Sequence, residues 1–214
     1  LYPCQVVDDS PLGKTYKLIG FKPYSHEETK DILAEMMEMI PDYCRVMRMM
    51  REFPKEKLIE GLEKLDIRKD IEEEFREKGL KIKEIRMREI GFNQKDLDLD
   101  VKIKSIEYDS AGGKEFFLEF VNKDDVLFGL LRLRLSDKGA MVRELHVYGQ
   151  ALNLSEKGFE SQHRGLGKIL MKKAEEIAKE NGFEKLSVIS GIGVREYYKK
   201  LGYVLEEPYM VKSL

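Results

Sequence analysis

The stretch Gln162-His163-Arg164-Gly165-Leu166-Gly167, with the helical pattern that follows it, decides how this chain folds. Apolar residues recur at helical spacing as far as Ile177 and predict a helix over residues 165–181 that ends at Gly182. Glycines at the start of a helix let backbone N–H groups approach a ligand closely, and the helix dipole favours negative charge there. The stretch therefore predicts an anion site at the start of this helix.

A pyrophosphate group suits such a site, and Arg164 or Lys168 can add positive charge beside it. The alternative is that the two glycines serve only a tight turn. The segments on either side of the stretch decide between these interpretations.

Strand-like segments surround the predicted helix. Four segments before it alternate apolar and polar residues and are separated by turn residues, which is typical of antiparallel strands. After it, the pattern predicts a strand, a short helix and one or two final strands. The earlier segments are residues 101–108, 114–121, 126–135 and 141–148, and the later ones are residues 184–190, 194–201 and 203–211. The second half of the chain is therefore rich in strands.

The first hundred residues follow a different pattern. The start of the chain is rich in proline and glycine, and Ser25 then caps a helix predicted over residues 26–40. Beyond it, the sequence predicts a short strand, one or two helices closed by Gly79, and another strand. These segments are residues 43–50, 55–79 and 80–90. We therefore divide the chain into a region 1–98 and a domain 99–214.

Composition argues against the membrane-spanning and secreted classes. The chain has 214 residues, of which 42% are hydrophobic and 36% charged, and its formal net charge at pH 7 is -2. Its longest uncharged apolar run, Val126–Leu131, is far shorter than the ~20 residues that span a bilayer, and no secretory signal opens it. Because an initiator Met is lacking, we expect an excised fragment of a cytoplasmic protein. The low net charge means that nucleic-acid binding has to rest on local patches.

Cysteine and histidine usage argues against a disulfide scaffold and a metal site. Cys4 and Cys44 lie far apart and are expected to be reduced thiols. His26, His146 and His163 are too scattered for a zinc site. We predict no bound metal.

A second motif, Arg195-Glu196-Tyr197-Tyr198-Lys199-Lys200-Leu201-Gly202-Tyr203, follows the strand predicted at 184–190. Together with the glycine stretch, it resembles the GNAT acetyltransferase superfamily. The resemblance implies a GNAT fold, in which helices flank a mixed, mostly antiparallel sheet, preceded here by a smaller α/β linker region. It also implies acetyl-CoA in the groove between the strands at 141–148 and 184–190.

The resemblance also assigns roles to individual residues. The pyrophosphate loop and helix start would be Gln162, His163, Arg164, Gly165, Leu166, Gly167 and Lys168. The main chain around Leu145, His146 and Val147 would hold the pantetheine arm and the acetyl carbonyl. Tyr197 and Tyr198 would complete the site, and Tyr198 has the position of the tyrosine that points at the thioester sulfur. A neutral phenol can protonate a departing thiolate; the alternative for both tyrosines is aromatic core packing.

Further motifs occur in both halves of the chain: Val142-Arg143-Glu144-Leu145-His146-Val147-Tyr148-Gly149, Ser187-Val188-Ile189-Ser190-Gly191-Ile192-Gly193, Pro208-Tyr209-Met210-Val211-Lys212, Arg45-Val46-Met47-Arg48-Met49-Met50-Arg51-Glu52-Phe53-Pro54 and Arg86-Met87-Arg88-Glu89. They resemble a narrower family, the radical-SAM/GNAT enzymes that include the catalytic subunit of Elongator. The last two motifs resemble the end of the radical-SAM half and the linking region. The resemblance thus covers nearly the whole chain.

This narrower resemblance implies an acyltransferase domain of an enzyme that modifies the wobble uridine of tRNA. The acetyl group of acetyl-CoA would pass toward a radical centre and yield a carboxymethyl-type group on carbon 5. The other half of such a protein binds S-adenosylmethionine and a [4Fe-4S] cluster, whose cysteine triplet is absent here. The partial reaction expected of this chain is therefore tRNA-stimulated cleavage of the thioester. The implied partners are the anticodon region of tRNA and a homo-oligomer or Elongator-like assembly, with no membrane.

Some members of this family carry a structural zinc near the segment that corresponds to Arg86-Met87-Arg88. Here Ile82, Glu84 and Met87 stand around that segment, so we predict no such zinc.

Two sets of polar residues are candidates for the remaining roles. Glu144 and His146 point to the same face of an alternating strand, and either could activate a water as a general base. Their alternative role is a structural ion pair or a surface position. The candidates for tRNA phosphate contacts are Arg45, Arg48, Arg51, Arg86 and Arg88, the last two on alternate positions of a predicted strand. Their alternative is a solvated charged face.

Two other functions stay possible at this point. A GNAT N-acetyltransferase acting on a protein lysine or a small-molecule amine would explain the motifs of residues 141–212 without the first hundred residues. Such an acceptor usually needs a nearby base, which the sequence does not place convincingly. The second alternative is a module that binds CoA or RNA without turnover, and the presence of Tyr198 and both loop glycines argues against it.

Overall fold

The computed structural model describes residues 1–62, 66–92, 97–148 and 165–214. The chain divides into two compact units, Leu1–Met87 and Arg88–Leu214, each with its own hydrophobic core. This division lies earlier than residue 98, because the segment after Met87 already packs with the second unit. Arg88 Nη2 donates to Glu119 Oε2 at 2.6 Å, and Ile90 belongs to the core of that unit.

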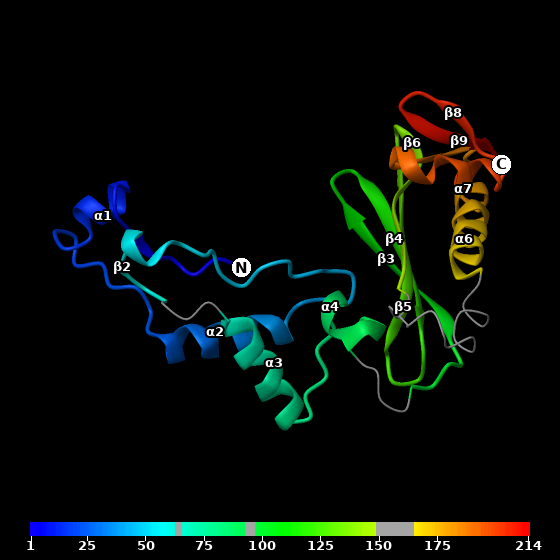
Figure 1. The fold of residues 1–214 in the computed structure, drawn as a ribbon. Coiled ribbons are helices and arrows are strands. Elements are labelled where there is room, and N and C mark those ends of the chain that lie inside the picture. Colours follow the sequence, from blue (N-terminus) through cyan, green and yellow to red (C-terminus); the bar gives the residue numbers. More distant parts are fainter. Residues whose placement is uncertain (63–65, 93–96, 149–164) are drawn as a thin grey trace. The chain divides into compact units, whose positions relative to one another are not determined.

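The first unit consists of short elements around two helices (Figure 1). They are β1 (Val6–Val7), α1 (Pro11–Thr15), α2 (His26–Glu38), η1 (Lys55–Lys57), β2 (Leu58–Glu60), α3 (Ile67–Glu77) and α4 (Ile85–Arg88), whose last residue opens the second unit. The helix α2 begins where the sequence predicts: Ser25 Oγ accepts the Glu28 N–H, and the Glu28 carboxylate accepts the Ser25 N–H. The strands β1 and β2 form a two-stranded antiparallel sheet.

The core of the first unit lies between α2 and α3. Leu33 and Met37 of α2 pack in one cluster with Ile67, Ile71 and Phe75 of α3, and all five are buried. Within each helix these residues are spaced four apart, which puts them on one face of the helix. The amphipathic pattern thus pairs the two longest helices of this unit.

The strand predicted at residues 43–50 is wrong. The Val46 N–H donates to Glu84 Oε1 at 2.6 Å, and Arg68 Nη1 donates to the Val46 carbonyl at 2.7 Å. Two side chains therefore satisfy backbone groups that a neighbouring strand would otherwise have paired. The segment is irregular as a result.

The predictions for residues 55–79 and 80–90 also need correction. The first range contains β2 before α3, which begins only at Ile67, although the chain does leave the helix through Gly79 in the left-handed region (φ 65°). The second range holds the short helix α4 instead of a strand. The Glu84 carboxylate accepts the Met87 N–H at 2.9 Å, as a side chain at a helix N-terminus does.

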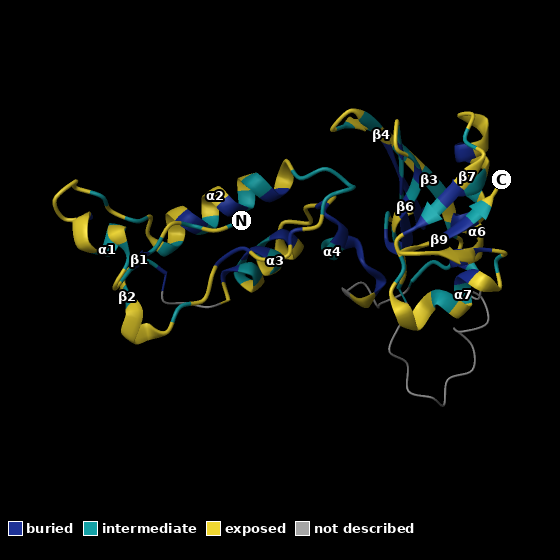
Figure 2. Cartoon of the chain, turned by 90° about the horizontal axis from the view of Figure 1, so that it is seen from above, coloured by how far each residue is buried: buried dark blue, intermediate teal, exposed yellow. Residues whose placement is uncertain are grey.

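The second unit is built on a seven-stranded sheet with the order β3-β4-β5-β6-β7-β9-β8. Its elements are η2 (Ile90–Phe92), β3 (Lys102–Ser110), β4 (Gly113–Val121), β5 (Leu127–Ser136), β6 (Gly139–Val147), α6 (Leu166–Glu180), β7 (Lys185–Val188), η3 (Ile192–Val194), α7 (Arg195–Lys199), β8 (Val204–Glu206) and β9 (Tyr209–Ser213). The strands β6 and β7 are parallel, and the other neighbouring pairs are antiparallel. Buried positions concentrate in the strands β4 and β5 of this sheet (Figure 2). The predicted mixed, mostly antiparallel sheet with flanking helices is confirmed.

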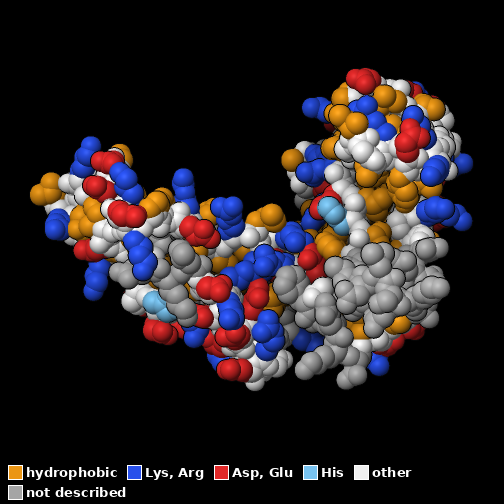
Figure 3. Space-filling view, viewed as in Figure 1, with side chains coloured by type: hydrophobic (Ala, Val, Ile, Leu, Met, Phe, Trp, Pro, Cys, Tyr) orange, Lys and Arg blue, Asp and Glu red, His pale blue; other side chains and the backbone are white. Residues whose placement is uncertain are grey.

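The surface of both units carries charges of both signs, interspersed on the face seen in Figure 3. Within the described ranges, no helix is long and apolar enough to cross a membrane. The same residues bring together no group of three or more His, Cys, Asp or Glu side chains that could hold a metal ion. Cys4 and Cys44 are free thiols, the first exposed and the second half-buried.

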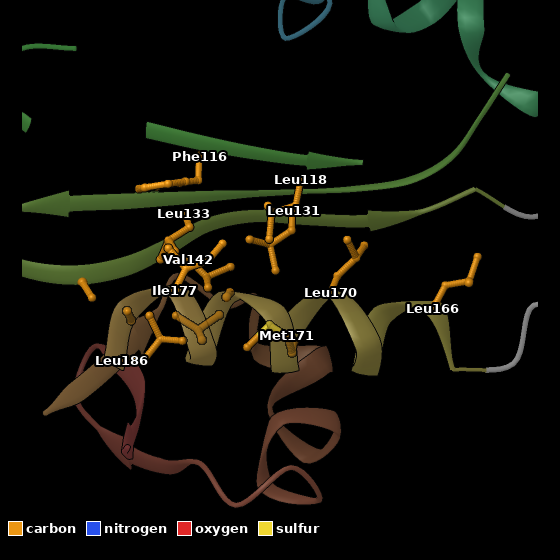
Figure 4. Packing of buried hydrophobic residues seen from close by; sticks show 14 of the residues in the cluster. Phe116, Leu118, Leu131, Leu133, Val142, Leu166, Leu170, Met171, Ile177 and Leu186 are labelled. Atoms are coloured by element: carbon orange, nitrogen blue, oxygen red, sulfur yellow. The ribbon is translucent and has the colours of Figure 1, made fainter. Parts of the chain in front are cut away.

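The helix α6 covers one face of the sheet and completes the second core. Leu118 of β4 and Leu131 of β5 point toward Leu170 and Met171 of α6 (Figure 4), and all four side chains are buried. The helix lies directly after the glycine stretch, so this packing fixes where the start of α6 lies relative to β6. The candidate site is built at that place.

Candidate active site

The sheet opens where β6 and β7 separate. The two strands pair over Ala140–Val142 and Leu186–Val188, and β6 then continues to Val147. On its other side β6 stays paired with β5, but the register of the two strands shifts after Arg132, as it does at a β-bulge. A bulge bends the strand that contains it and increases the local twist, so this irregularity helps to turn β6 away from β7.

Backbone groups of β6 face into this opening. The Tyr148 N–H donates to the Phe128 carbonyl at 2.8 Å, toward β5. Because backbone groups alternate in direction along a strand, those of Leu145 and Val147 point away from β5 and into the opening. In the part of the chain that the structure describes, no strand pairs with them on that side. The backbone groups of His146 face β5 by the same alternation, so the opening has main-chain partners at two of the three predicted positions.

The helix α6 begins beside this opening with a glycine in the left-handed region. Gly165 is the N-cap and has φ 118° and ψ −8°, a conformation that L side chains rarely adopt. The helical hydrogen bond nearest the start joins the Ile169 N–H to the Gly165 carbonyl at 3.0 Å. The N–H groups of Leu166, Gly167 and Lys168 therefore have no acceptor within the helix. Such donors at a helix N-terminus form a site for an anion.

A pocket of about 360 Å³ joins the opening to the helix start. It is lined by Leu145, Val147, Gly165, Gly167, Lys168, Val194, Tyr197 and Tyr198. The predicted residue Leu166 is not among them, because its side chain is buried in the core. The predicted residues Gln162, His163 and Arg164 lie outside the described residues. The pocket thus has mostly apolar walls, the N-terminal backbone donors of α6 at one end, and Lys168 in its lining.

Two tyrosines of α7 close one side of the pocket. A Cβ on Gly167 would lie 2.8 Å from Tyr197 Oη, so a larger residue here would displace the Tyr197 side chain. Tyr198 is 5% exposed, and its ring packs edge-to-face on that of Tyr197, with the ring centroids 5.2 Å apart. Burial raises the pKa of both phenols, so both carry a proton at neutral pH. Tyr198 is therefore at once a core residue and a pocket residue.

Glu144 and His146 lie together, on the opposite face of β6 from the pocket-lining side chains. His146 Nε2 lies 3.0 Å from Glu144 Oε1, and Arg132 Nε donates to Glu144 Oε2 at 2.6 Å. The His146 ring stacks against Tyr148 with the ring centroids 6.3 Å apart, while 55% of its side chain is exposed. The carboxylate is thus held in an ion pair, and the imidazole is accessible to solvent.

Three of the arginines proposed for RNA lie on one exposed segment of the first unit. Arg45, Arg48 and Arg51 are exposed, whereas Val46 and Met49 between them are buried. The buried side chains anchor the segment and leave the three guanidinium groups facing outward. They form a local basic patch.

The other two arginines belong to α4, so their prediction on alternate positions of a strand is wrong. Arg86 is half-buried. Arg88 is buried, and its guanidinium pairs with Glu119 at 2.6 Å and with Asp125 at 3.3 Å. Because this guanidinium is engaged inside the second unit, Arg88 is not part of the RNA surface that we propose.

Comparison with known proteins decides the family. Residues 79–203, more than half of the chain, match the acetyltransferase (GNAT) family. The chain belongs to the GNAT acetyltransferase family. Residues 1–77 of this GNAT chain match a second family, the radical-SAM C-terminal domain.

Curated relatives match the whole of the GNAT chain. The tRNA uridine(34) acetyltransferase of Methanocaldococcus infernus is 38% identical over 232 residues, which cover 100% of this chain and 43% of the relative. Elongator complex protein 3 of Schizosaccharomyces pombe is 38% identical over 231 residues, which cover 100% of this chain and 42% of the relative. The chain thus spans less than half the length of these two relatives. The resemblance to the radical-SAM/GNAT family is confirmed.

A solved structure is similar over the same range. The archaeal Methanocaldococcus infernus Elp3 with an N-terminal deletion superimposes with a TM-score of 0.88 at 37% identity. The superposition covers 100% of this chain and 54% of that one. At this identity and score, the likeness extends through both units of the GNAT chain.

Sequence reasoning missed two residues of the site. Arg132 was recognisable as a polar position of its strand, but only the cross-strand register puts it opposite Glu144. Val194 lines the pocket from the turn before α7, and no periodic pattern marks it.

Proposed function

We propose that this GNAT chain binds acetyl-CoA and cleaves its thioester when tRNA binds. The acetyl group would supply a carboxymethyl-type modification at carbon 5 of the wobble uridine. The observation that carries the proposal is a single pocket that unites the open backbone groups of β6, the N-terminal donors of α6 and the Tyr198 phenol. Relatives named for tRNA uridine(34) acetylation support the choice of substrate.

The pocket residues fit acetyl-CoA part by part. The first N–H groups of α6 and the Lys168 ammonium suit a pyrophosphate. The backbone groups of Leu145 and Val147 suit the amides of a pantetheine arm, which can pair with them as an added strand would. When bound, acetyl-CoA supplies an acetyl group activated as a thioester. Further phosphate contacts are proposed for Gln162, His163 and Arg164.

Tyr198 is proposed as the proton donor. Its phenol borders the pocket, and burial raises its pKa, so the donor form predominates at neutral pH. The Tyr198 hydroxyl can deliver its proton to the departing sulfur. Tyr197 has a different part, because its hydroxyl packs against Gly167 and shapes the pocket wall.

His146 is proposed as the proton acceptor, and Glu144 as the residue that orients it. Because His146 Nε2 faces Glu144 Oε1, its Nδ1 is the atom left to take a proton from a water that attacks the thioester carbonyl; in this partial reaction the acetyl group would leave as acetate, and the sulfur, protonated by Tyr198, as the CoA thiol. Arg132 fixes the other carboxylate oxygen. Because Arg132 and His146 bind the two oxygens of the Glu144 carboxylate, the more exposed His146 imidazole is the member of the pair that water can reach.

The exposed arginines Arg45, Arg48 and Arg51, together with Arg86, are proposed to contact phosphates in the anticodon region of tRNA. The match to the radical-SAM C-terminal domain supports a longer protein that also binds S-adenosylmethionine and a [4Fe-4S] cluster. The two cysteines of this chain are too few for a three-cysteine cluster site. We place the protein in the cytoplasm, as a homo-oligomer or in an Elongator-like assembly.

Calorimetric titration of acetyl-CoA tests the binding site. Gly165→Glu should abolish micromolar binding, because the side chain enters the phosphate site. Gly182→Glu is the control: Gly182 lies just beyond the other end of α6 and also has a positive φ (82°), so this variant adds the same side chain at a backbone position that favours glycine while the pocket is intact. Loss of binding in both variants would point to strain in α6 and would contradict the proposed site.

A thiol-release assay then tests the reaction with tRNA, a lysine peptide and small amines as additions. Stimulation by tRNA alone supports the proposal. Acetylation of the peptide or an amine would support a GNAT N-acetyltransferase instead. Acetyl-CoA binding without turnover under every condition would support a binding module.

A further inference from the structure

A polar cluster lies against Tyr198 outside the set of pocket-lining residues. Tyr203 is 1% exposed, and its hydroxyl donates to Glu175 Oε1 on α6 at 2.9 Å. Lys212 Nζ on β9 lies 2.9 Å from both oxygens of the same carboxylate. Through one carboxylate, the cluster joins α6, β9 and the residue that precedes β8.

Tyr203 contacts Tyr198 in two ways. The Tyr203 N–H donates to the Tyr198 carbonyl at 3.1 Å, across the turn made by Gly202 in the left-handed region (φ 87°). The two rings also pack edge-to-face, with centroids 6.0 Å apart and planes at 71°. Tyr198 is therefore packed between the rings of Tyr197 and Tyr203.

The orientation of the Tyr203 ring depends on Glu175. A buried hydroxyl without an acceptor is costly, so the Tyr203 ring is held where its hydroxyl reaches the carboxylate. Lys212 balances the charge of that carboxylate and keeps it in place on the side of β9. Rotation or withdrawal of the Tyr203 ring would open space beside Tyr198.

We propose that Glu175 is a positioning residue for thioester cleavage: through Tyr203, it holds the Tyr198 ring so that its hydroxyl faces the pocket. This proposal rests on the proposed role of Tyr198 as proton donor. It also assigns a purpose to Lys212, which lies in a terminal motif that the acetyl-CoA site does not use.

The first test observes Tyr198 in the chain without acetyl-CoA. NMR of tyrosine labelled with ¹³C at Cζ gives one signal per tyrosine, and the Tyr198 signal is the one absent from Tyr198→Phe. Glu175→Leu and Tyr203→Phe should shift or broaden this signal. Glu175→Gln should preserve it, because the amide oxygen still accepts from Tyr203. The matched control is Glu176→Leu, at the neighbouring position, where 44% of the side chain is exposed.

The second test measures tRNA-stimulated thiol release in the same variants. Tyr203→Phe and Glu175→Leu should lower turnover by about three- to tenfold, with acetyl-CoA affinity within about twofold of the parent, and neither should lower it further in a Tyr198→Phe background. Glu175→Gln should recover most of the turnover. An equal loss in the Tyr198→Phe background, or lost acetyl-CoA binding, would overturn the proposal, because the cluster would then act on something other than Tyr198.

Failure of the proposed function has a different signature. If Tyr198→Phe alone leaves turnover unchanged, the proton-donor role is wrong. If the Tyr198 signal is unmoved by Glu175→Leu and Tyr203→Phe, the positioning role is wrong whatever the assay shows.

Discussion

Replacement of Glu84 by leucine should destabilise the first unit by about 3–5 kcal/mol. The Glu84 side chain is 0% exposed and accepts the N–H groups of Val46 and Met87 at 2.6 and 2.9 Å. It also lies 3.4 Å from Arg68 Nη2, whose side chain is 13% exposed. Each unpaired backbone donor costs about 1–3 kcal/mol, and the loss of the carboxylate beside a nearly buried guanidinium adds to this.

Urea unfolding followed by circular dichroism measures this change, and hydrogen exchange locates it. A loss of about 3 kcal/mol corresponds to exchange roughly a hundredfold faster over residues 43–51. Glu77→Leu, on the exposed side of α3, is the control and should change stability by less than about 0.5 kcal/mol. Equal unfolding midpoints for Glu84→Leu and Glu77→Leu would refute the reasoning.

Glu84→Leu should weaken the binding of tRNA more than the binding of acetyl-CoA. Glu84 and Arg68 hold the segment that displays Arg45, Arg48 and Arg51, whereas the pocket proposed for acetyl-CoA is lined entirely by residues of the second unit. Glu84→Leu should therefore weaken tRNA binding in a gel-shift assay while the calorimetric affinity for acetyl-CoA stays the same.

Three further predictions concern the proposed reaction. Tyr198→Phe should lower tRNA-stimulated thiol release by about tenfold or more at unchanged acetyl-CoA affinity; unchanged turnover would exclude the proton-donor role. Because burial raises the pKa of Tyr198 and its protonated form is the donor, the rate should show no decline assigned to this phenol below about pH 10; a decline near pH 8 that Tyr198→Phe removes would contradict this. Substituting Ala for Arg45, Arg48 and Arg51 together should lower the slope of log affinity against log salt for tRNA by about two to three, and an unchanged slope would exclude phosphate contacts there.

The second unit was predictable because its signals are local. Alternation over residues 101–148 and the helical spacing from Leu166 to Ile177 each report one buried face, and the structure has the strands and the helix there. The glycine at 165 was recognisable as a helix-start residue. The positive φ of Gly165 fits this role, because the chain turns sharply at this residue before it enters α6.

The first unit was less predictable because side chains distant in sequence take its backbone groups. The alternation at residues 43–50 looks like a strand, yet the Val46 N–H and carbonyl are bound by Glu84 and Arg68. Arg88 looked like an exposed strand residue, yet it is buried with Glu119. No short-range pattern distinguishes these partners from a β-ladder.

The sequence by itself predicted the order of elements in the second unit, through the periodicity of neighbouring residues. The resemblance of its motifs to the GNAT family implied the family and the glycines and tyrosines of the pocket. Only the tertiary structure decided that Arg132 pairs with Glu144, that Glu84 binds the backbone of the arginine segment, and that Tyr203 packs on Tyr198 and donates to Glu175. Those contacts join residues from different elements, and they depend on strand register and helix packing, which the whole chain sets when it buries its core.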